Sequence, residues 1–463
     1  MTLRAYLASL EGKHIAVLGV GVSNLPLLRL LAGAGLSVTA YDRRDREKLQ
    51  AAISELEPRG VHFSCGEDYL AGLSADVIFR TPGMRPDVPE IAAAVAAGAV
   101  LTSEMEAFFA VCPCPIIAIT GSDGKTTTST LISEMLKRAG YTVHLGGNIG
   151  TPLLSLADEM SAGDYAVVEL SSFQLMTMTE SAGTAVVTNV SPNHLDVHRD
   201  MAEYIDAKRR VFAAQKAGDR VVLNLENEIT RGFMEEATGE VWCFAKTPAE
   251  RNGVYLQGDT IIVQENGESR PILPISEIFL PGLHNVENYM TAIAAVWGKV
   301  PEDAILRTAR EFHGVEHRIE FVRELDGVRY YNDSIASSPT RAIAGLRSFD
   351  QKLIMIAGGY DKHLSFEPLA PEILAHVKTL VLCGATAGMI RAAVENHAEY
   401  PSSGLSVLET DDFCRAIDLA RESAAPGDVV ILCPACASFD KFPNFMVRGE
   451  TYKNYVNEMA SAQ

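Results

Sequence analysis

The residues that most clearly point to chemistry lie in one short glycine-rich segment. An apolar run leads into Gly121-Ser122-Asp123-Gly124-Lys125-Thr126-Thr127, and helical spacing of apolar residues follows over about 130–139. A strand that feeds such a turn and then a helix directs backbone N–H groups at a phosphate chain. Lys125 can then reach the terminal phosphates, and the Thr126 hydroxyl can contact Mg²⁺. The segment predicts a phosphate site, although the full pattern would have glycine where this chain has Ile119.

A second group of polar residues follows neighbouring strands. Glu169 ends one apolar run, and His194 lies shortly after another. Because the carboxyl ends of parallel strands meet at one sheet edge, both side chains could lie near the phosphate turn and hold metal ions. His194 and His198, four positions apart, could instead suggest zinc, but no third ligand has the spacing of a zinc helix.

A further glycine turn lies near the start of the chain. Gly19-Val20-Gly21-Val22 begins like a dinucleotide-binding fingerprint, but Asn24 stands at the third glycine position, and Asp42 ends the next strand. The turn indicates amide contact with a phosphate more than it indicates NAD. A turn without any ligand is the alternative.

Length and charge limit the class of protein. At roughly 150 residues per domain, 463 residues suggest about three domains. The net charge of −19 argues against broad binding to nucleic acid or anionic lipid. No apolar run approaches the roughly 20 residues of a membrane span, and the first residues do not resemble a secretory signal. We therefore expect a cytoplasmic protein with no nucleic-acid or membrane partner, and eight scattered cysteines fit reduced thiols.

Strand and helix patterns alternate along the whole chain and predict an α/β fold with three domains, each built on a largely parallel sheet. We expect domains at 1–110, 111–313 and 314–463, the central one of the phosphate-loop ATPase type and the outer two Rossmann-like. Residues 239–274 carry several turn signals and predict an antiparallel appendage. The predicted strands are 14–19, 37–42, 61–65, 76–80, 100–102, 115–120, 141–145, 165–170, 185–189, 220–225, 319–323, 328–332, 352–357, 379–383 and 429–432.

Taken together, these motifs resemble the Mur ligase family, whose members use ATP to join amino acids to the UDP-linked muramoyl precursor of peptidoglycan. The resemblance covers the chain from end to end. Its landmarks are Thr120–Thr126, Gly147–Gly150, Glu169–Ser172, Asn193–Asp196, Lys208, Gly282–Asn285, Asn288 and Glu316–Arg318. Two C-terminal signatures, Tyr331–Ser334 and Pro434–Asp440, are similar to those of members that add D-glutamate to UDP-N-acetylmuramoyl-L-alanine. A monomer that takes these two substrates with ATP and Mg²⁺ is the implied enzyme.

The resemblance also implies residue roles. The catalytic set is Lys125, Glu169, His194, Lys208 and Arg318. The metal ligands are Thr126 and Glu169 for one ion, and His194 and a carbamylated Lys208 for a second. The ATP site comprises Gly121, Ser122, Asp123, Gly124, Lys125, Thr126, Thr127, Asn285, Asn288, His317, Arg318 and Asp333. The UDP-sugar site comprises Gly19, Val20, Gly21, Val22, Asp42, Thr81, Asn148 and His194. From the sequence alone, a solvated charge on a helix is the favoured interpretation of Lys208.

The D-glutamate site implied by the resemblance comprises Ser337, Lys362, Ser438 and Phe445. One position departs from the family pattern. Many members have lysine after Asn-Asp-Ser, where this chain has Ile335. Our hypothesis is that Lys362, assisted by Arg341, holds the side-chain carboxylate of D-glutamate. Lys362 as an ordinary surface lysine is the alternative.

Cys433 and Cys436 form a C-x-x-C pair that could be redox-active or half of a zinc site. No second such pair exists, and the segment coincides with the family's substrate loop, so we interpret both cysteines as structural.

Two other functions remain open from the residues. A sister ligase that adds another amino acid, or a folylpolyglutamate synthase, would share the ATP site. A nucleotide-binding regulatory protein or a dehydrogenase would leave Lys125, Glu169 and His194 without a shared purpose.

Overall fold

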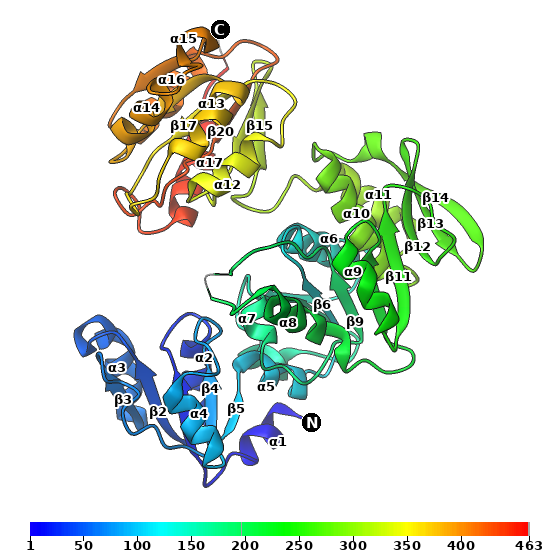
Figure 1. Ribbon diagram of the computed structural model, residues 1–463, viewed down its shortest axis with the longest axis vertical. Coiled ribbons are helices and arrows are strands. Elements are labelled where there is room, and N and C mark those ends of the chain that lie inside the picture. Colours follow the sequence, from blue (N-terminus) through cyan, green and yellow to red (C-terminus); the bar gives the residue numbers. More distant parts are fainter. Residues whose placement is uncertain (196, 462–463) are drawn as a thin grey trace. The chain divides into compact units, whose positions relative to one another are not determined.

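The structure is a computed structural model that describes residues 1–195 and 197–461. Asp196, the last residue of the Asn193–Asp196 motif, lies outside the described residues. The chain forms two compact units, one of residues 1–278 with 284–310 and the other of residues 279–283 with 311–463. Three largely parallel sheets, two in the first unit and one in the second, confirm the predicted three-domain α/β class (Figure 1). The exact domain boundaries remain a prediction.

The first sheet has the order β3-β2-β1-β4-β5, and all its strand pairs are parallel. The strands are β1 (His14–Leu18), β2 (Ser37–Asp42), β3 (Val61–Cys65), β4 (Val77–Arg80) and β5 (Val100–Thr102). The helices are α1 (Leu3–Ala8), α2 (Asn24–Gly33), α3 (Gln50–Leu56), α4 (Pro89–Ala96) and α5 (Glu104–Val111). The chain winds outward from β1 in both directions, so the turn after β1 lies where ligands of parallel sheets bind.

The second sheet has the order β14-β13-β12-β11-β10-β9-β6-β8-β7. Its strands are β6 (Ile116–Thr120), β7 (Val143–Gly147), β8 (Tyr165–Glu169), β9 (Thr184–Val187), β10 (Arg220–Asn224), β11 (Glu240–Ala245), β12 (Gly253–Gln257), β13 (Thr260–Glu265) and β14 (Glu268–Pro274). Its helices are α6 (Lys125–Arg138), α7 (Ser172–Leu175), α8 (Met201–Ala213), α9 (Glu228–Gly232), α10 (Leu283–Val296) and α11 (Glu302–Glu311). Strand β6 lies between β8 and β9, so the glycine-rich turn that follows it again occupies a point where the strand order reverses.

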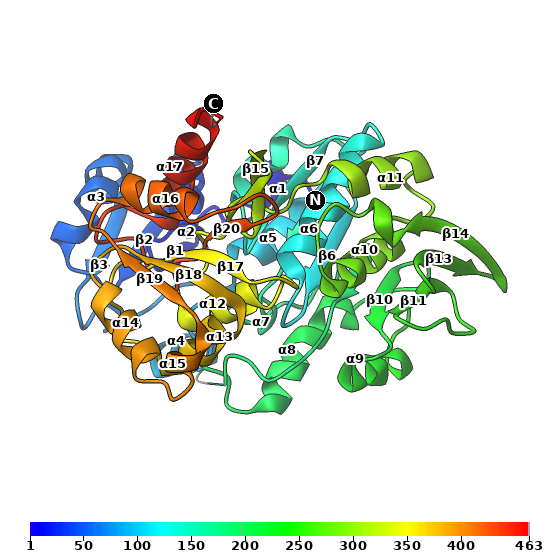
Figure 2. The same ribbon diagram turned by 90° about the horizontal axis from the view of Figure 1, so that it is seen from above.

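The predicted antiparallel appendage over 239–274 is wrong in part. Strand β11 pairs parallel with β10, and β12 pairs parallel with β11, so both extend the central sheet. Only the pairings of β13, with β12 and with β14, are antiparallel, and β13 and β14 form the edge of the sheet in both views (Figures 1 and 2). Turn residues mark where strands end but do not give the direction of the next strand. Trp242 and Cys243 of β11 are fully buried, as strands inside a covered parallel sheet are.

The third sheet has the order β15-β16-β20-β17-β18-β19, parallel except for the antiparallel pair β15 and β16. Its strands are β15 (Glu320–Leu325), β16 (Val328–Asn332), β17 (Leu353–Ala357), β18 (Val377–Leu382), β19 (Ser406–Glu409) and β20 (Val429–Leu432). Its helices are α12 (Pro339–Leu346), α13 (Ala370–His376), α14 (Ala387–Glu395), α15 (Tyr400–Ser403), α16 (Phe413–Glu422) and α17 (Phe445–Glu458). The sequence patterns missed β19, an edge strand with exposed Ser406 and Glu409 and little apolar character.

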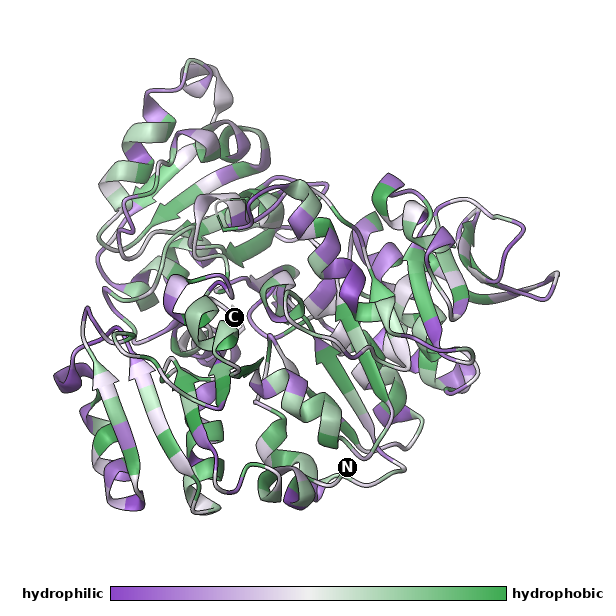
Figure 3. Cartoon of the chain, turned by 60° about the horizontal axis from the view of Figure 1, so that its bottom comes forward, coloured by the Kyte–Doolittle hydropathy of each residue, from purple (hydrophilic) through white to green (hydrophobic). Residues whose placement is uncertain are grey.

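Buried apolar residues lie on strands of all three sheets, and many of these strand segments are green in Figure 3. Buried, closely packed strands therefore lead into the turns after β1, β6, β16, β17 and β20. Among the described residues, we find no helix with the length and apolar character that crossing a membrane requires.

Candidate active site

The turn after β6 can be made only with glycine at two positions. Gly121 has φ 152° and Gly124 has φ 78°, a region that favours glycine. A Cβ atom at Gly121 would lie 1.8 Å from Thr188 Oγ1, and one at Gly124 would lie 2.6 Å from Asn288 Oδ1. The backbone therefore passes close to two neighbouring segments, and helix α6 begins immediately at Lys125. This geometry places the first amides of α6 beside the turn, as the phosphate-site prediction requires.

Two lysine amines converge on one carbonyl of this turn. Lys125 Nζ donates to Gly121 O at 2.9 Å and to Ser122 O at 2.9 Å, and Lys208 Nζ donates to Gly121 O at 2.6 Å. Lys208 comes from α8, so two elements far apart in sequence bring their amines to one point. The Lys125 amine beside the helix amides suits the terminal phosphates of a nucleotide.

The surroundings of Lys208 contradict its interpretation as a solvated helix charge. Its side chain is 1% exposed, and Nζ lies 4.6 Å from the centroid of the Tyr204 ring. Burial, followed by the nearby positive charge of Lys125, lowers the pKa of Lys208 well below its usual value. A lowered pKa favours the free amine, which is the form that can react with CO₂.

Glu169 has the properties of a metal ligand. It ends β8, is 1% exposed, and accepts a hydrogen bond from Asn148 Nδ2 on Oε1 at 2.8 Å. Its other oxygen, Oε2, is buried and has no hydrogen-bond partner among the described residues. A buried carboxylate oxygen without a partner is costly unless a cation or water satisfies it. Glu169 therefore fits a divalent cation, and Asn148, expected at the UDP-sugar, lies directly against this carboxylate.

His194 lies on a short exposed turn. It has φ 55°, and its carbonyl accepts hydrogen bonds from the amides of Val197 at 3.1 Å and His198 at 3.0 Å. Its ring lies edge-on to the ring of Phe173, with centroids 5.1 Å apart. His198 is buried, stacks on the same Phe173 and shares a 2.9 Å hydrogen bond with Ser172 Oγ. His198 therefore packs the turn, which disfavours the alternative of a zinc site formed by the two histidines.

The remaining predicted ATP-site residues of the first unit surround the same turn. Ser122 Oγ accepts from the Ser191 amide at 2.9 Å, and the Asp123 amide donates to Asn189 Oδ1 at 2.9 Å. Thr126 and Thr127 lie in the first turn of α6, and Thr126 is buried. On α10, Asn288 Nδ2 donates to Asn285 Oδ1 at 3.3 Å, and Asn288 Oδ1 accepts from Thr128 Oγ1 at 3.3 Å.

The turn after β1 is held by a carboxylate. The Val20 amide donates to Asp42 Oδ2 at 2.8 Å, and Arg44 donates to both carboxylate oxygens and to the Val20 carbonyl. Burial alone would raise the pKa of Asp42, but the hydrogen bonds from Arg44 and the Val20 amide outweigh it and lower the pKa. A Cβ atom at Gly19 would lie 3.1 Å from Thr81 Cγ2. The predicted residues Gly19, Val20, Asp42 and Thr81 thus lie together, and the exposed Gly21 and Val22 complete the turn.

Asn24 explains the missing third glycine of the dinucleotide pattern. Its side chain is 1% exposed, and Nδ2 donates to the carbonyl of Leu18 at 2.9 Å. The asparagine therefore ties α2 to the end of β1.

In the second unit, Asp333 follows β16 and is deeply buried. Its Oδ1 accepts from the Ile319 amide at 3.3 Å, and Cys433 Sγ lies 3.6 Å from Oδ2. Burial raises the pKa of Asp333 to about 7, although the Ile319 amide and the charge of Arg318 act in the opposite direction. His317 has φ 63°, and its Nδ1 lies 3.0 Å from Asn332 Nδ2. The structure thus brings His317, Arg318 and Asp333 to one end of this sheet.

The loops expected to bind D-glutamate follow neighbouring strands of the same sheet. The Tyr360 amide donates to Ala437 O at 2.9 Å, which ties the loop after β17 to the loop after β20. Lys362 is exposed in the first loop, and Ser438 is buried in the second. Phe445 begins α17, with its ring 5.9 Å from that of His317. Ser337 is half-buried in the turn before α12, and Arg341 Nη1 donates to Ile335 O at 3.3 Å.

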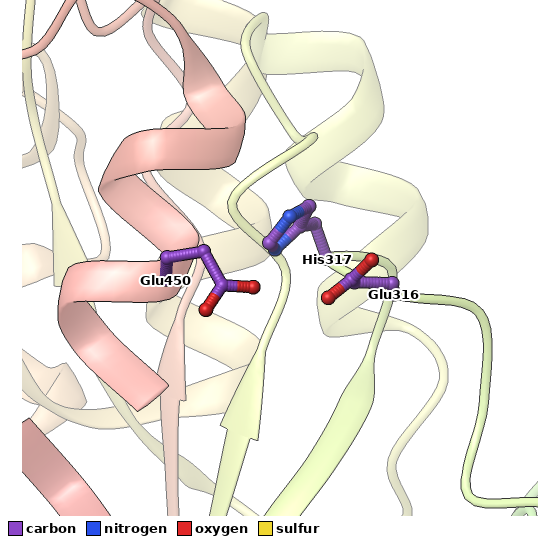
Figure 4. Close-up of side chains that lie close together, drawn as sticks. All are labelled: Glu316, His317 and Glu450. Atoms are coloured by element: carbon purple, nitrogen blue, oxygen red, sulfur yellow. The ribbon is translucent and has the colours of Figure 1, made fainter. Parts of the chain in front are cut away.

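Glu316, His317 and Glu450 place possible ligand atoms within 4.8 Å of one another (Figure 4). Lys453 lies among these groups, with Nζ 2.7 Å from Glu316, 3.0 Å from Glu320 and 3.1 Å from Glu450. The three carboxylates raise the pKa of Lys453 despite its burial. An ammonium already occupies the place of a cation, so we interpret the cluster as an ion-pair network that supports His317.

The two cysteines of the C-x-x-C pair are both buried. Cys433 contacts Asp333, and Cys436 Sγ lies 3.0 Å from Thr386 Oγ1. Burial raises the pKa of both thiols, Cys436 to about 11, which favours a structural role over a redox one.

Sequence reasoning missed several arginines that hold the site loops. Arg448 is 2% exposed and donates to Ser334 Oγ, Ser334 O, Ala437 O and Cys436 O at 2.8–3.2 Å. Arg44, Arg80 and Arg85 act similarly in the first unit. Only Arg44 could have been found from a local signal, because it lies two residues after Asp42, the residue that ends β2. The others also bond residues distant in sequence: Arg80 reaches Phe173, Arg85 reaches Val197, and Arg448 reaches Ser334.

The comparisons with known proteins agree with these features. Residues 13–103 match the family described as Mur ligase MurD-like, N-terminal domain; residues 119–296 match Mur ligase middle domain; and residues 317–436 match Mur ligase, glutamate ligase domain.

Two relatives match the chain over nearly its whole length. The chain is 49% identical over 460 residues to UDP-N-acetylmuramoylalanine--D-glutamate ligase of Acetivibrio thermocellus and 47% identical over 460 residues to that of Ruminiclostridium cellulolyticum, with 99% of both chains covered in each case. The fold is also similar to UDP-N-acetylmuramate-alanine ligase from Thermotoga maritima, with TM-score 0.57 at 16% identity over 96% of this chain and 100% of that one.

Proposed function

This chain belongs to the Mur ligase family, and from that premise we propose that it joins D-glutamate to UDP-N-acetylmuramoyl-L-alanine, with hydrolysis of ATP to ADP and phosphate, in peptidoglycan synthesis. The observation that carries this function is the similarity, over 99% of both chains, to relatives of that name. We place the enzyme in the cytoplasm as a monomer, in keeping with the soluble substrates.

The reaction requires an activated carboxyl group, because a carboxylate does not react with an amine in water. A carboxylate oxygen of the muramoyl-alanine attacks the γ-phosphorus of ATP, ADP leaves, and an acyl phosphate forms. The amine of D-glutamate then attacks the acyl carbon to give a tetrahedral intermediate, and phosphate leaves as the amide forms. Both partners in the first step are anions, so positive charge must lie between them. Lys125, with the amides of the 121–124 turn, supplies part of that charge.

Magnesium is the cofactor that we propose, and the buried, unpartnered oxygen of Glu169 supports a divalent cation at this position. Thr126 and Glu169 would hold one ion, and His194 and a modified Lys208 would hold a second. When bound, Mg²⁺ would neutralise the phosphate oxygens and bring the two anionic substrates together.

Lys208 is proposed to carry a carbamate. The ammonium first loses a proton. The neutral Nζ then attacks the carbon of CO₂, and a second proton leaves from the nitrogen to solvent, so that a cation is replaced by an anion. The lowered pKa of the buried amine supports this step, because only the unprotonated amine reacts. The conversion also replaces the repulsion between Lys208 and Lys125 with attraction.

The substrate sites follow the resemblance. We propose that Gly19, Val20, Gly21, Val22, Asp42, Thr81, Asn148 and His194 contact the UDP-sugar. His317, Arg318, Asp333, Asn285 and Asn288 contact ATP together with residues 121–127. Ser337, Lys362, Ser438 and Phe445 contact D-glutamate, and Lys362 takes the side-chain carboxylate that a lysine at the position of Ile335 would otherwise hold.

The test is phosphate release with ATP, UDP-N-acetylmuramoyl-L-alanine and one acceptor at a time from D-glutamate, L-alanine, L-lysine and diaminopimelate. We expect turnover with D-glutamate only, and none when either substrate is omitted. Turnover with another acceptor but not with D-glutamate would identify a sister ligase. The Lys362→Ala variant should raise the KM for D-glutamate; an unchanged KM would contradict the role given to Lys362.

A further inference from the structure

Arg80 and Arg85 flank the short loop 81–84 that follows β4 and begins with Thr81. Arg80 is 1% exposed, and burial lowers its pKa to about 10. Among the described residues, its guanidinium donates to uncharged oxygens: Thr81 O, Pro82 O, Met84 O, Phe173 O and Thr177 Oγ1. One buried side chain thus gathers three carbonyls of the loop and joins them to α7.

Arg85 makes a second connection from the other end of the loop. Its Nη1 donates to the carbonyl of Val197 at 2.7 Å, and its two Nη atoms lie 2.9 and 3.0 Å from the carboxylate oxygens of Glu203. Asp87 pairs with the same guanidinium, and the Arg199 amide donates to Glu203 at 2.8 Å. A two-pronged arginine–carboxylate pair fixes orientation as well as distance.

Both arginines donate hydrogen bonds to the segments that position His194. Phe173, whose carbonyl accepts from Arg80, contacts the ring of His194. Val197, whose carbonyl accepts from Arg85, closes the His194 turn through its amide. Glu203 lies on α8, the helix that carries Lys208. Loop 81–84 is therefore joined to both sides of the His194 turn.

We propose that Arg85, supported by Arg80, is a positioning residue that holds the His194 turn and the start of α8 in register with loop 81–84. This inference rests on the proposed function, because it takes Thr81 as a contact of the UDP-sugar and His194 as a contact of the reacting groups. Arg85 touches neither substrate. It sets where His194 lies relative to the sugar-nucleotide, and a misplacement of about 1 Å in such a site can reduce turnover by about 100-fold.

The test compares Arg85→Ala and Arg85→Lys with a matched control, Arg29→Ala. Arg29 makes an equivalent two-pronged pair with Glu55 on the surface of the same domain, at 2.7 and 2.8 Å. In each protein without ligand, we measure the hydrogen exchange of the Val197 and His198 amides. Steady-state kinetics then give kcat, the KM for ATP and the Mg²⁺ concentration for half-maximal rate.

We expect Arg85→Ala to speed exchange of both amides, to lower kcat by about 10- to 100-fold and to raise the Mg²⁺ requirement, with the KM for ATP within about twofold. The exchange rates and kcat of Arg85→Lys should lie between those of Arg85→Ala and those of the native protein. The same quantities in Arg29→Ala should match the native protein within about twofold.

Unchanged exchange or unchanged kcat in Arg85→Ala overturns the inference. If Arg85→Ala does not fold, Arg85→Lys with native exchange and native kcat overturns it equally. A native protein that releases no phosphate with D-glutamate contradicts the proposed function instead, and the exchange measurement, which needs no substrate, separates the two failures.

Discussion

Two glycine turns of the first unit have equivalent places in their sheets but different charged neighbours. The turn 19–22 and the turn 121–124 each follow a central parallel strand and precede a helix. In the first, the Val20 amide already donates to the carboxylate of Asp42. In the second, the amines of Lys125 and Lys208 meet at the Gly121 carbonyl. An equivalent place in the sheet therefore does not give equal ligands; the side chains that face the turn decide how strongly it can bind an anion.

The largest expected effect is the loss of phosphate release when Lys208 is removed from the second turn. Lys208→Ala removes the buried amine and the carbamate that we propose it forms, and we expect phosphate release to fall by about 100- to 1000-fold. The matched control is Arg209→Ala, the next residue on α8, whose ion pairs with Asp206 and Glu236 are exposed. It should retain nearly full turnover. Full turnover of Lys208→Ala, with no bicarbonate dependence of the native enzyme, would remove Lys208 from the site and weaken the contrast between the turns.

An intermediate effect is expected on stability, when one glycine in each turn is replaced by alanine. Gly124→Ala must adopt φ near 78° and displace Asn288 Oδ1, so we expect the free energy of unfolding to fall by about 2–4 kcal/mol. Gly21→Ala is the matched substitution in the first turn, where nothing lies within 4 Å of the added carbon. It should change the free energy by less than about 0.5 kcal/mol. Urea unfolding measures both, and equal losses would show that the two turns are equally constrained.

The smallest effect concerns Asp42. Because its folded pKa is lowered, its contribution to stability is present above the unfolded pKa of about 3.9 and is lost as the pH falls through the folded value. Asp42→Asn should therefore cost about 1 kcal/mol at pH 7 and progressively less as the pH falls below about 3.9. The measurement is the free energy of unfolding of both proteins from pH 7 downwards through the acid range. A difference that does not shrink on acidification would mean that the hydrogen bonds, not the charge, hold the first turn.

Local sequence patterns are sufficient to predict those features that consecutive residues determine. The phosphate turn and nearly every strand were predicted in this way, because a buried parallel strand is an uninterrupted apolar run. Helix α6 begins at Lys125, ahead of the predicted 130–139, because the polar threonines after the turn hide its first residues.

What could not be predicted depends on distant contacts. Lys208 reads as a surface charge until α8 packs against the turn that ends β6. Arg80 and Arg85 find their acceptors at Phe173 and Val197, far along the chain, and no spacing rule reports such pairs. The direction of β12 was likewise decided by its pairing with β11 and not by the turn before it.

The outer strand of the central sheet has a consequence beyond the active site. Strand β14 ends the nine-stranded sheet, and an open strand edge is a template for pairing with a strand of another molecule. Pro271 and Pro274 lack the amide that such pairing needs, and Arg270, paired with Glu302, puts charge along the same strand. This edge of the sheet that carries the phosphate turn is therefore poorly suited to pairing with a strand of another molecule.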